Sequence, residues 1–213
     1  MDQKSYQLGG IVLILSSLTA AVGSFLHGDQ PATLDAYNAL GTSWAVSHVA
    51  IGISATLLLI GALFLARHFA RTAGNGLALV AAGSLIVGGV AIFALGALET
   101  SGFSAAAAEG GVAGQHAFVA VSAVMLSMSA GAGFLFPVAL AAFGLAMLQD
   151  SGWPAWLAWL GVVLGVATLA VNAFGIPLGP VPNVFGYLSD GWYAILGVLF
   201  MGRGQAGQAA TPA

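Results

Sequence analysis

The 213-residue chain is too apolar for a water-soluble domain, because 59% of its residues are hydrophobic and only 5% are charged. Soluble proteins average about 25% charged residues, and so few ionic groups could not cover a soluble fold. A net charge of −3 with four Lys and Arg residues excludes a nucleic-acid-binding surface. The absence of cysteine excludes disulfides, thiolate catalysis and cysteine-ligated metals. The composition therefore indicates an integral membrane protein.

Six stretches of the chain are apolar over about the 20 residues that a transmembrane helix needs. They cover approximately residues 8–26, 45–66, 76–98, 117–148, 155–174 and 184–201. A membrane barrel is excluded because no segment alternates polar and apolar residues, and helices then satisfy the backbone in lipid. We expect an all-α, six-span transmembrane bundle formed as one domain by residues 1–201. The proline-rich segment 175–183 should be an extended connector, and residues 202–213 a flexible tail.

The cations predict the orientation of the bundle. All four cations fall on one side of the predicted bundle: Lys4, Arg67, Arg71 and Arg203. The charged residues of the loops on the opposite side are all acidic. The positive-inside rule then places both termini in the cytoplasm and the protein in the cell (inner) membrane, with the lipid bilayer as its principal partner. Tyr37 and Trp44 should mark the outer interface, and His68 should be a solvated cytoplasmic loop residue.

The fourth apolar stretch is longer than a membrane requires. Residues 117–148 would form a helix of about 48 Å, against a hydrocarbon core of about 30 Å. The helix must therefore protrude or bend, and Gly131, Gly133 and Pro137 are where a bend is expected. In that case the carbonyl freed near Gly133 needs another hydrogen-bond partner.

Small residues are frequent inside the spans, and Gly161 and Gly165 form one small-xxx-small pair. Such faces let helix backbones approach closely in lipid. We favour packing within one bundle, while a partner helix or a homo-oligomer remains the alternative.

Polar residues collect near the outer ends of the spans, and each span contributes one of them. They are His27, His48, Glu99, His116, Asn172 and Asp190. This follows from the alternating direction of the helices, since odd spans end outside and even spans begin there. Ionisable groups at membrane depth usually face a cavity or a partner. We therefore expect an outer-half pocket whose candidate ligands are His48, His116, Asp190, His27 and Glu99.

Three kinds of chemistry suit this set. Imidazole and carboxylate groups bind transition metals such as Zn, Cu, Fe or Ni, and two histidines on different helices could hold a haem. A pair such as His48 and Asp190 could instead relay protons or bind a small polar ligand. No two of these residues are spaced to ligate from one helix, so separate helices must build the site. Each residue also has a purely structural interpretation. His27, Glu99 and His116 could be ordinary polar residues at the membrane interface, His48 could form a structural hydrogen bond, and Asn172 could form a hydrogen bond between helices. For Asp190 the structural interpretation is a helix cap.

Other functional classes remain open. An accessory or structural subunit without chemistry would show a dispersed polar set. A small transporter would use breaks in the helices, but the inner half of the second span is wholly apolar. A hydrolase would need a serine, a histidine and an acid within reach, and Ser47 and His48 are adjacent in sequence and point about 100° apart. The sequence does not decide whether any reaction is catalysed.

Four segments resemble an uncharacterised family of bacterial and archaeal membrane proteins with six to seven helices and unknown function. The segments are Tyr6-Gln-Leu-Gly-Gly-Ile-Val-Leu13, Trp44-Ala-Val-Ser-His48, the stretch from Phe136-Pro137 to Gly144 with Trp153-Pro-Ala-Trp-Leu157 and Gly161, and Asp190-Gly-Trp-Tyr193. The resemblance implies six helices and an acidic residue in the last span, where the family usually carries Glu rather than Asp. It implies no activity.

Overall fold

The computed structural model describes all residues except 29, 175–181 and 210–213, and it consists of helices with no strand among those residues. In chain order the elements are α1 (Gln3–His27), α2 (Leu34–Leu40), α3 (Thr42–Phe69), α4 (Asn75–Ala97), the π-helix η1 (Leu98–Gly102), α5 (Phe103–Glu109), α6 (Gly111–Leu148), α7 (Ala155–Phe174) and α8 (Pro182–Ala209). Side-chain caps fix two of the starts. Asp2 accepts a hydrogen bond from the backbone N–H of Ser5 at α1, and Thr33 accepts one from Ala36 at α2.

Six helices in the described part of the chain are long and apolar enough to cross a membrane, which confirms six long apolar helices at the predicted stretches and suggests a membrane protein. The main differences are at the ends of the elements. The helix containing the fourth span begins at Gly111 rather than 117, and α8 continues to Ala209, past the expected end at 201. Most of the predicted connector, residues 175–181, and the last four residues of the predicted tail lie outside the described residues.

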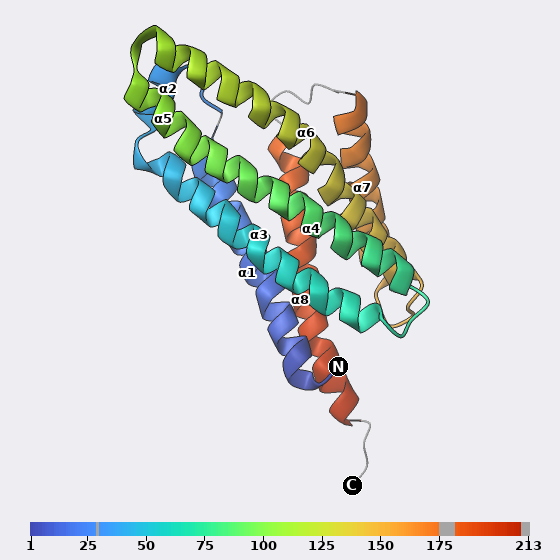
Figure 1. Ribbon diagram of the computed structural model, residues 1–213. Coiled ribbons are helices and arrows are strands. Elements are labelled where there is room, and N and C mark those ends of the chain that lie inside the picture. The colour runs from blue at the N-terminus through green and yellow to red at the C-terminus, as the bar shows by residue number, and fades with distance from the viewer. Residues whose placement is uncertain (29, 175–181, 210–213) are drawn as a thin grey trace.

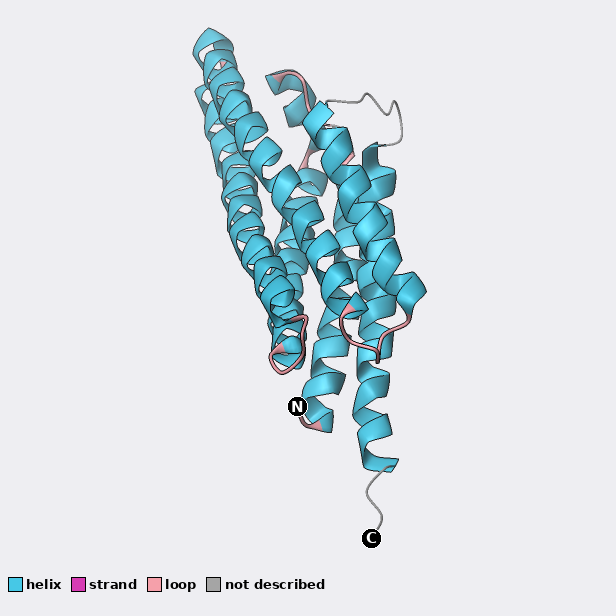
Figure 2. Ribbon diagram, turned by 90° about the vertical axis from the view of Figure 1, so that its right-hand side faces the viewer, coloured by secondary structure: helices cyan, strands magenta, loops and turns pink. Residues whose placement is uncertain are grey.

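The six long helices form a closed ring in which each packs on its neighbours in the chain. α1 packs on α3, α3 on α4, α4 on α6, α6 on α7, and α7 on α8, while α8 returns to α1. Figure 2 shows these helices running side by side, with the described loops near the two ends of the bundle. The start of α1 and the end of α8 lie at the same end (Figure 1). We call it the termini end, and the other the far end.

Close helix packing explains the glycines of α7. A Cβ added to Gly165 would lie 2.6 Å from the carbonyl oxygen of Pro137 on α6, and one added to Gly161 would lie 2.8 Å from the Trp192 ring on α8. Both glycines of the small-xxx-small pair therefore serve packing within the ring, as we favoured. Homo-oligomerisation through other faces stays a prediction.

A hydrogen bond between α6 and α7 meets the need that Pro137 creates. Proline has no N–H to donate to the carbonyl four residues earlier, which here belongs to Gly133. The side-chain Nδ2 of Asn172 donates to that carbonyl at 2.6 Å. The helix therefore continues through Pro137. Asn172 forms a hydrogen bond between helices, as its structural interpretation predicted.

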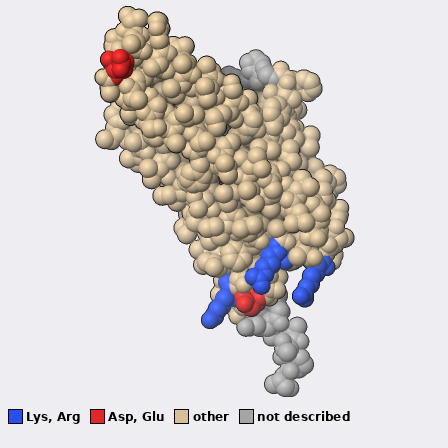
Figure 3. Space-filling view, in the orientation of Figure 1, with Lys and Arg blue, Asp and Glu red and all other residues tan. Residues whose placement is uncertain are grey.

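The two ends of the bundle differ in charge and in the short helices that lie over them. In the face shown in Figure 3, Lys and Arg gather at the termini end. At the far end the short helices α2 and α5 lie over the long ones, and Leu34, Trp44 and Phe103 are buried there together. Phe103 is fully buried and anchors α5, which lies between the third and fourth long helices in the chain.

Candidate metal centre at the far end

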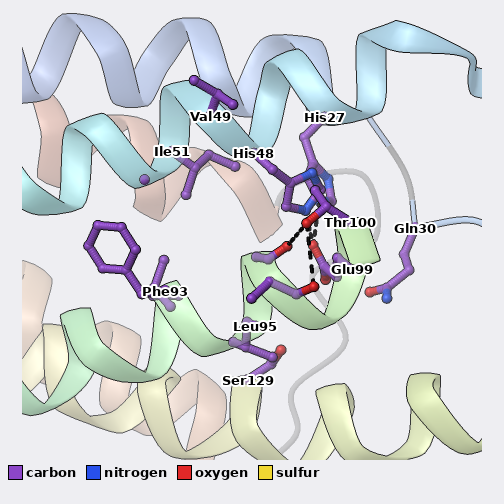
Figure 4. Close-up of a pocket in the computed structure, with 14 residues that line it drawn as sticks. His27, Gln30, His48, Val49, Ile51, Phe93, Leu95, Glu99, Thr100 and Ser129 are labelled. Carbon is purple, nitrogen blue, oxygen red and sulfur yellow. Dashed lines mark hydrogen bonds and ion pairs between the residues drawn. The ribbon is translucent and has the colours of Figure 1, made fainter. Parts of the chain in front are cut away.

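Three of the predicted residues meet near the far end of the ring. His27 is the last residue of α1, His48 lies near the start of α3, and Glu99 lies in η1 directly after α4. One potential ligand atom from each residue lies within 4.8 Å of the others. Figure 4 shows the two imidazoles and the carboxylate turned toward one another from three separate helices. This is the type of cluster that can hold a metal ion.

The ring of His48 is oriented by its own helix. Its Nδ1 lies 2.7 Å from the backbone carbonyl oxygen of Trp44, one turn earlier in α3. Because a carbonyl only accepts, Nδ1 carries the proton and Nε2 is left with a lone pair when the ring is neutral. That Nε2 faces the carboxylate oxygen Oε2 of Glu99. His48 and Glu99 are only 8% and 7% exposed, so both groups are largely withdrawn from bulk solvent.

His27 is arranged in the same way from the end of α1. Its Nδ1 lies 3.1 Å from the carbonyl oxygen of Gly28, and its Nε2 lies 3.7 Å from Oε2 of Glu99. Two neutral imidazoles therefore direct their lone pairs toward the same carboxylate oxygen. Three acceptors that converge in this way need a shared cation, either a proton or a metal ion. Donation of the second ring N–H to a carbonyl is the usual arrangement for histidines that bind metal.

A π-helical turn presents Glu99 to the histidines. η1 interrupts the helical run from Asn75 to Glu109, and such turns are rare and often occur at functional sites. The π turn holds an extra residue, so it changes the direction in which the following side chains point. The sequence pattern placed Glu99 at the outer end of a span and among the candidate ligands, but it did not predict this π-helical turn.

Aromatic side chains shield the cluster. The Trp44 ring lies 4.4 Å from that of His27 and 4.7 Å from that of His48, measured between centroids, and Trp44 is 2% exposed. Tyr37 and Phe103 pack on the outer side of Trp44. The Trp44 indole is therefore a buried wall of the site, and its place at the membrane interface stays a prediction.

On its other side the cluster opens to a cavity of about 430 Å³. Gln30, Thr100 and Ser129 supply polar groups to its lining, while Phe93 and Val49 are among its apolar residues. Figure 4 shows the cluster at one end of this lining. A metal ion held by His27, His48 and Glu99 would keep room for a further ligand on the cavity side.

The other two predicted ligands lie elsewhere. His116 is exposed on α6, and it does not line the cavity of the cluster. Asp190 lies inside α8 rather than at its start, and it lines a second cavity in the centre of the ring. The predicted ligands therefore belong to two sites rather than one pocket. α8, which carries Asp190, packs on α1 and α7, whereas the His27–His48–Glu99 cluster lies between α1, α3 and η1.

A second polar cluster at the termini end was missed by the sequence reasoning. His68 is half-buried at the end of α3, where its Nδ1 accepts a hydrogen bond of 3.0 Å from the Tyr6 hydroxyl and its Nε2 donates one of 3.1 Å to Asp150. Arg203 lies 3.6 Å from the same carboxylate and stacks over the Trp153 ring at 3.9 Å. The prediction that His68 is a solvated loop residue is wrong. The network ties α1, α3 and α8 to the turn between α6 and α7.

The negative charge of this network is the carboxylate of Asp150, in the turn between α6 and α7. Partial burial acts to raise the pKa of Asp150, but the backbone N–H of Gly152, the His68 ring and the Arg203 guanidinium outweigh it. The pKa of Asp150 is therefore lowered from its usual value, and the carboxylate is the charged acceptor of the network.

No family model matches the chain, and neither curated proteins nor solved structures show a significant match to it. The resemblance to a six-to-seven-helix membrane family therefore stays a prediction. What the site can do follows from its own geometry.

Proposed function

We propose that this protein is an integral protein of the cell membrane, with both termini in the cytoplasm, that binds a divalent transition metal through His27, His48 and Glu99. The observation that carries the proposal is the common direction of the two histidines. Each ring holds its Nδ1 proton against a backbone carbonyl and turns its Nε2 toward one carboxylate oxygen. A metal ion satisfies all three acceptors at once.

The two imidazoles and the carboxylate favour a transition metal such as zinc or iron. Two imidazoles and one carboxylate with room for another ligand are typical of catalytic zinc sites and of non-haem iron sites. A haem fits less well, because its two axial histidines must lie on opposite faces of the macrocycle. Here the rings of His27 and His48 are 4.9 Å apart and approach the same carboxylate.

The cation distribution supports the orientation. Lys4 lies in the first turn of α1, Arg67 and Arg71 lie at the turn between α3 and α4, and Arg203 lies near the end of α8. All four positions belong to the termini end, so the positive-inside rule favours an orientation with that end in the cytoplasm and the metal centre in the outer half of the membrane.

The test is the metal content per chain of the full-length protein, purified in detergent without chelators and measured by elemental mass spectrometry. We expect about one equivalent of a transition metal in the wild type, and its loss in His48→Ala and in Glu99→Gln. His116→Ala is the matched control, because this exposed histidine lies outside the cluster. Circular dichroism and gel filtration establish that each variant is folded.

Two results would overturn the proposal. One is the same metal content in the wild type, His48→Ala and Glu99→Gln. The other is the absence of metal above background even after equilibration with Zn²⁺. The cluster would then be a protonated histidine paired with Glu99, and the accessory-subunit interpretation would replace the metal-binding one.

A further inference from the structure

A second cavity of about 390 Å³ lies at the centre of the helix ring. All six long helices contribute to its lining, for example through Ser24 of α1, Ser54 of α3 and Pro137 of α6. Ile51 and Ile92 line both this central cavity and the cavity of the metal centre, so the two spaces adjoin. The proposed metal ligands do not line the central cavity.

The central cavity contains a carboxylate without a basic neighbour. Asp190 of α8 lines it, and none of the described residues that line it is Lys, Arg or His. Asp190 forms no hydrogen bond or ion pair within the described part of the chain. An ionised carboxylate at this depth is costly unless a cation pairs with it.

The other polar groups of the cavity mainly offer acceptors. The hydroxyls of Thr168 and Ser189 each donate to a carbonyl of their own helix, at 2.8 Å in both cases, which leaves oxygen lone pairs for the cavity. The Ser54 hydroxyl donates to Ser16 across the α1–α3 contact at 2.9 Å. Asn172 uses one of its two Nδ2 hydrogens on Gly133, which leaves its Oδ1 as an acceptor and the second hydrogen as a donor. Such a lining is complementary to a ligand that carries several N–H donors.

The Tyr193 hydroxyl provides an independent sign of a missing partner. Tyr193 is 5% exposed, and its oxygen is buried without a hydrogen bond within the described structure. It lies one turn of α8 from Asp190 and lines the same cavity. A buried hydroxyl without a partner costs about 1–3 kcal/mol, so it indicates that a polar group belongs beside it.

The remaining walls are apolar and aromatic, and they include Phe136 and Leu140 from α6, Phe185 from α8 and Leu58 from α3. A small hydrated inorganic ion gains little from such walls, and a transition metal would find only one carboxylate. An organic ammonium would be stabilised by both the carboxylate and the apolar walls, because its charged head pairs with the carboxylate and its apolar body packs on the aromatic rings.

We propose that the central cavity binds a protonated amine with an apolar body, with the Asp190 carboxylate as counter-ion and with Asn172 and Tyr193 as hydrogen-bond partners. The site is separate from the metal centre and uses none of its ligands. It faces the middle of the ring, where all six helices meet.

The experiment is isothermal titration calorimetry of the detergent-purified full-length protein with phenethylammonium chloride and with n-hexylammonium chloride. We expect saturable binding by the wild type, and an affinity lower by about tenfold or more in Asp190→Asn, because the charge pair in the cavity is lost. Asp150→Asn is the matched control at the termini end and should bind as the wild type does. The neutral 2-phenylethanol should bind at least about tenfold more weakly than phenethylammonium.

Three outcomes would overturn the proposal. They are no saturable binding of either ammonium by the wild type, equal affinity in the wild type and Asp190→Asn, and equal affinity for the alcohol and the ammonium. The last result would mean that Asp190 is protonated and that the cavity takes neutral ligands. Failure here is distinguishable from failure at the metal centre, because His48→Ala should keep ammonium binding and Asp190→Asn should keep the metal.

Discussion

His48 turns its Nε2 toward the carboxylate of Glu99, although the two residues are 51 positions apart and belong to different helices. The Trp44 carbonyl holds the far side of the imidazole, and the π-helical turn η1 presents the carboxylate. A third acceptor, Nε2 of His27, approaches the same oxygen. The pair is therefore one edge of a three-ligand centre rather than an isolated contact.

The Pro137 defect and the Asn172 side chain should be energetically coupled. Asn172→Ala leaves the Gly133 carbonyl without its partner, and we expect a loss of stability of about 1 kcal/mol. In the Pro137→Ala background, the new backbone N–H can donate to Gly133, so the same substitution should cost less. A double-mutant cycle from unfolding in mixed micelles measures the difference. Equal costs in both backgrounds would contradict the account of this bond.

Gly165 should tolerate no side chain, whereas Gly83 should. A Cβ at Gly165 meets the α6 backbone at 2.6 Å, while one at Gly83 meets nothing within 4 Å. We expect Gly165→Ala to destabilise the protein by about 1–3 kcal/mol through overpacking. Gly83→Ala should be neutral or stabilising, because alanine favours the helix. Unfolding of the two variants beside the wild type checks this, and an equal effect at both positions would contradict the close α6–α7 packing.

The orientation can be tested directly, because the chain has no cysteine of its own. Ala73→Cys lies exposed in the turn between α3 and α4 at the termini end, and Ala113→Cys lies exposed in the first turn of α6 at the far end. A membrane-impermeant maleimide should label Ala113→Cys in intact cells and should label Ala73→Cys only after lysis. Labelling of Ala73→Cys in intact cells would reverse the orientation.

The network at the termini end should make stability depend on pH. The pKa of Asp150 is lower in the folded protein than in the unfolded chain, where it is near the usual value of about 3.9. Its contribution is therefore fully present above that value and is lost as the pH falls through the folded pKa. Unfolding between pH 7 and pH 3 should show the onset of this loss in the wild type.

Asp150→Asn should lack this component of the pH dependence, whereas Glu109→Gln, which removes an exposed acid at the end of α5, should keep it. Parallel pH profiles for Asp150→Asn and the wild type would show that the network does not stabilise the fold through this carboxylate.

The sequence predicted the six spans and the partner for Gly133 because both follow from local rules. A run of apolar residues must be helical in lipid, and a proline must free the carbonyl four residues earlier. The sequence also selected His27, His48 and Glu99, since the alternation of helix direction brings them to one end.

The rest depended on long-range packing. Spacing along the chain does not tell that Asp190 faces the ring centre or that His116 faces outward, because rotation of each helix is set by its neighbours. The π-helical turn at Glu99 and the burial of Trp44 against the histidines are likewise products of the assembled bundle. His68 was misjudged because its partners, Tyr6 and Asp150, come from distant segments.

The coordination sphere of the bound metal tests the central claim most directly. X-ray absorption spectroscopy of the zinc-loaded wild type should show two imidazole ligands and at least one oxygen ligand, and His27→Ala should show one imidazole fewer. A metal without imidazole scattering, or an imidazole count unchanged in His27→Ala, would contradict a centre built from His27, His48 and Glu99.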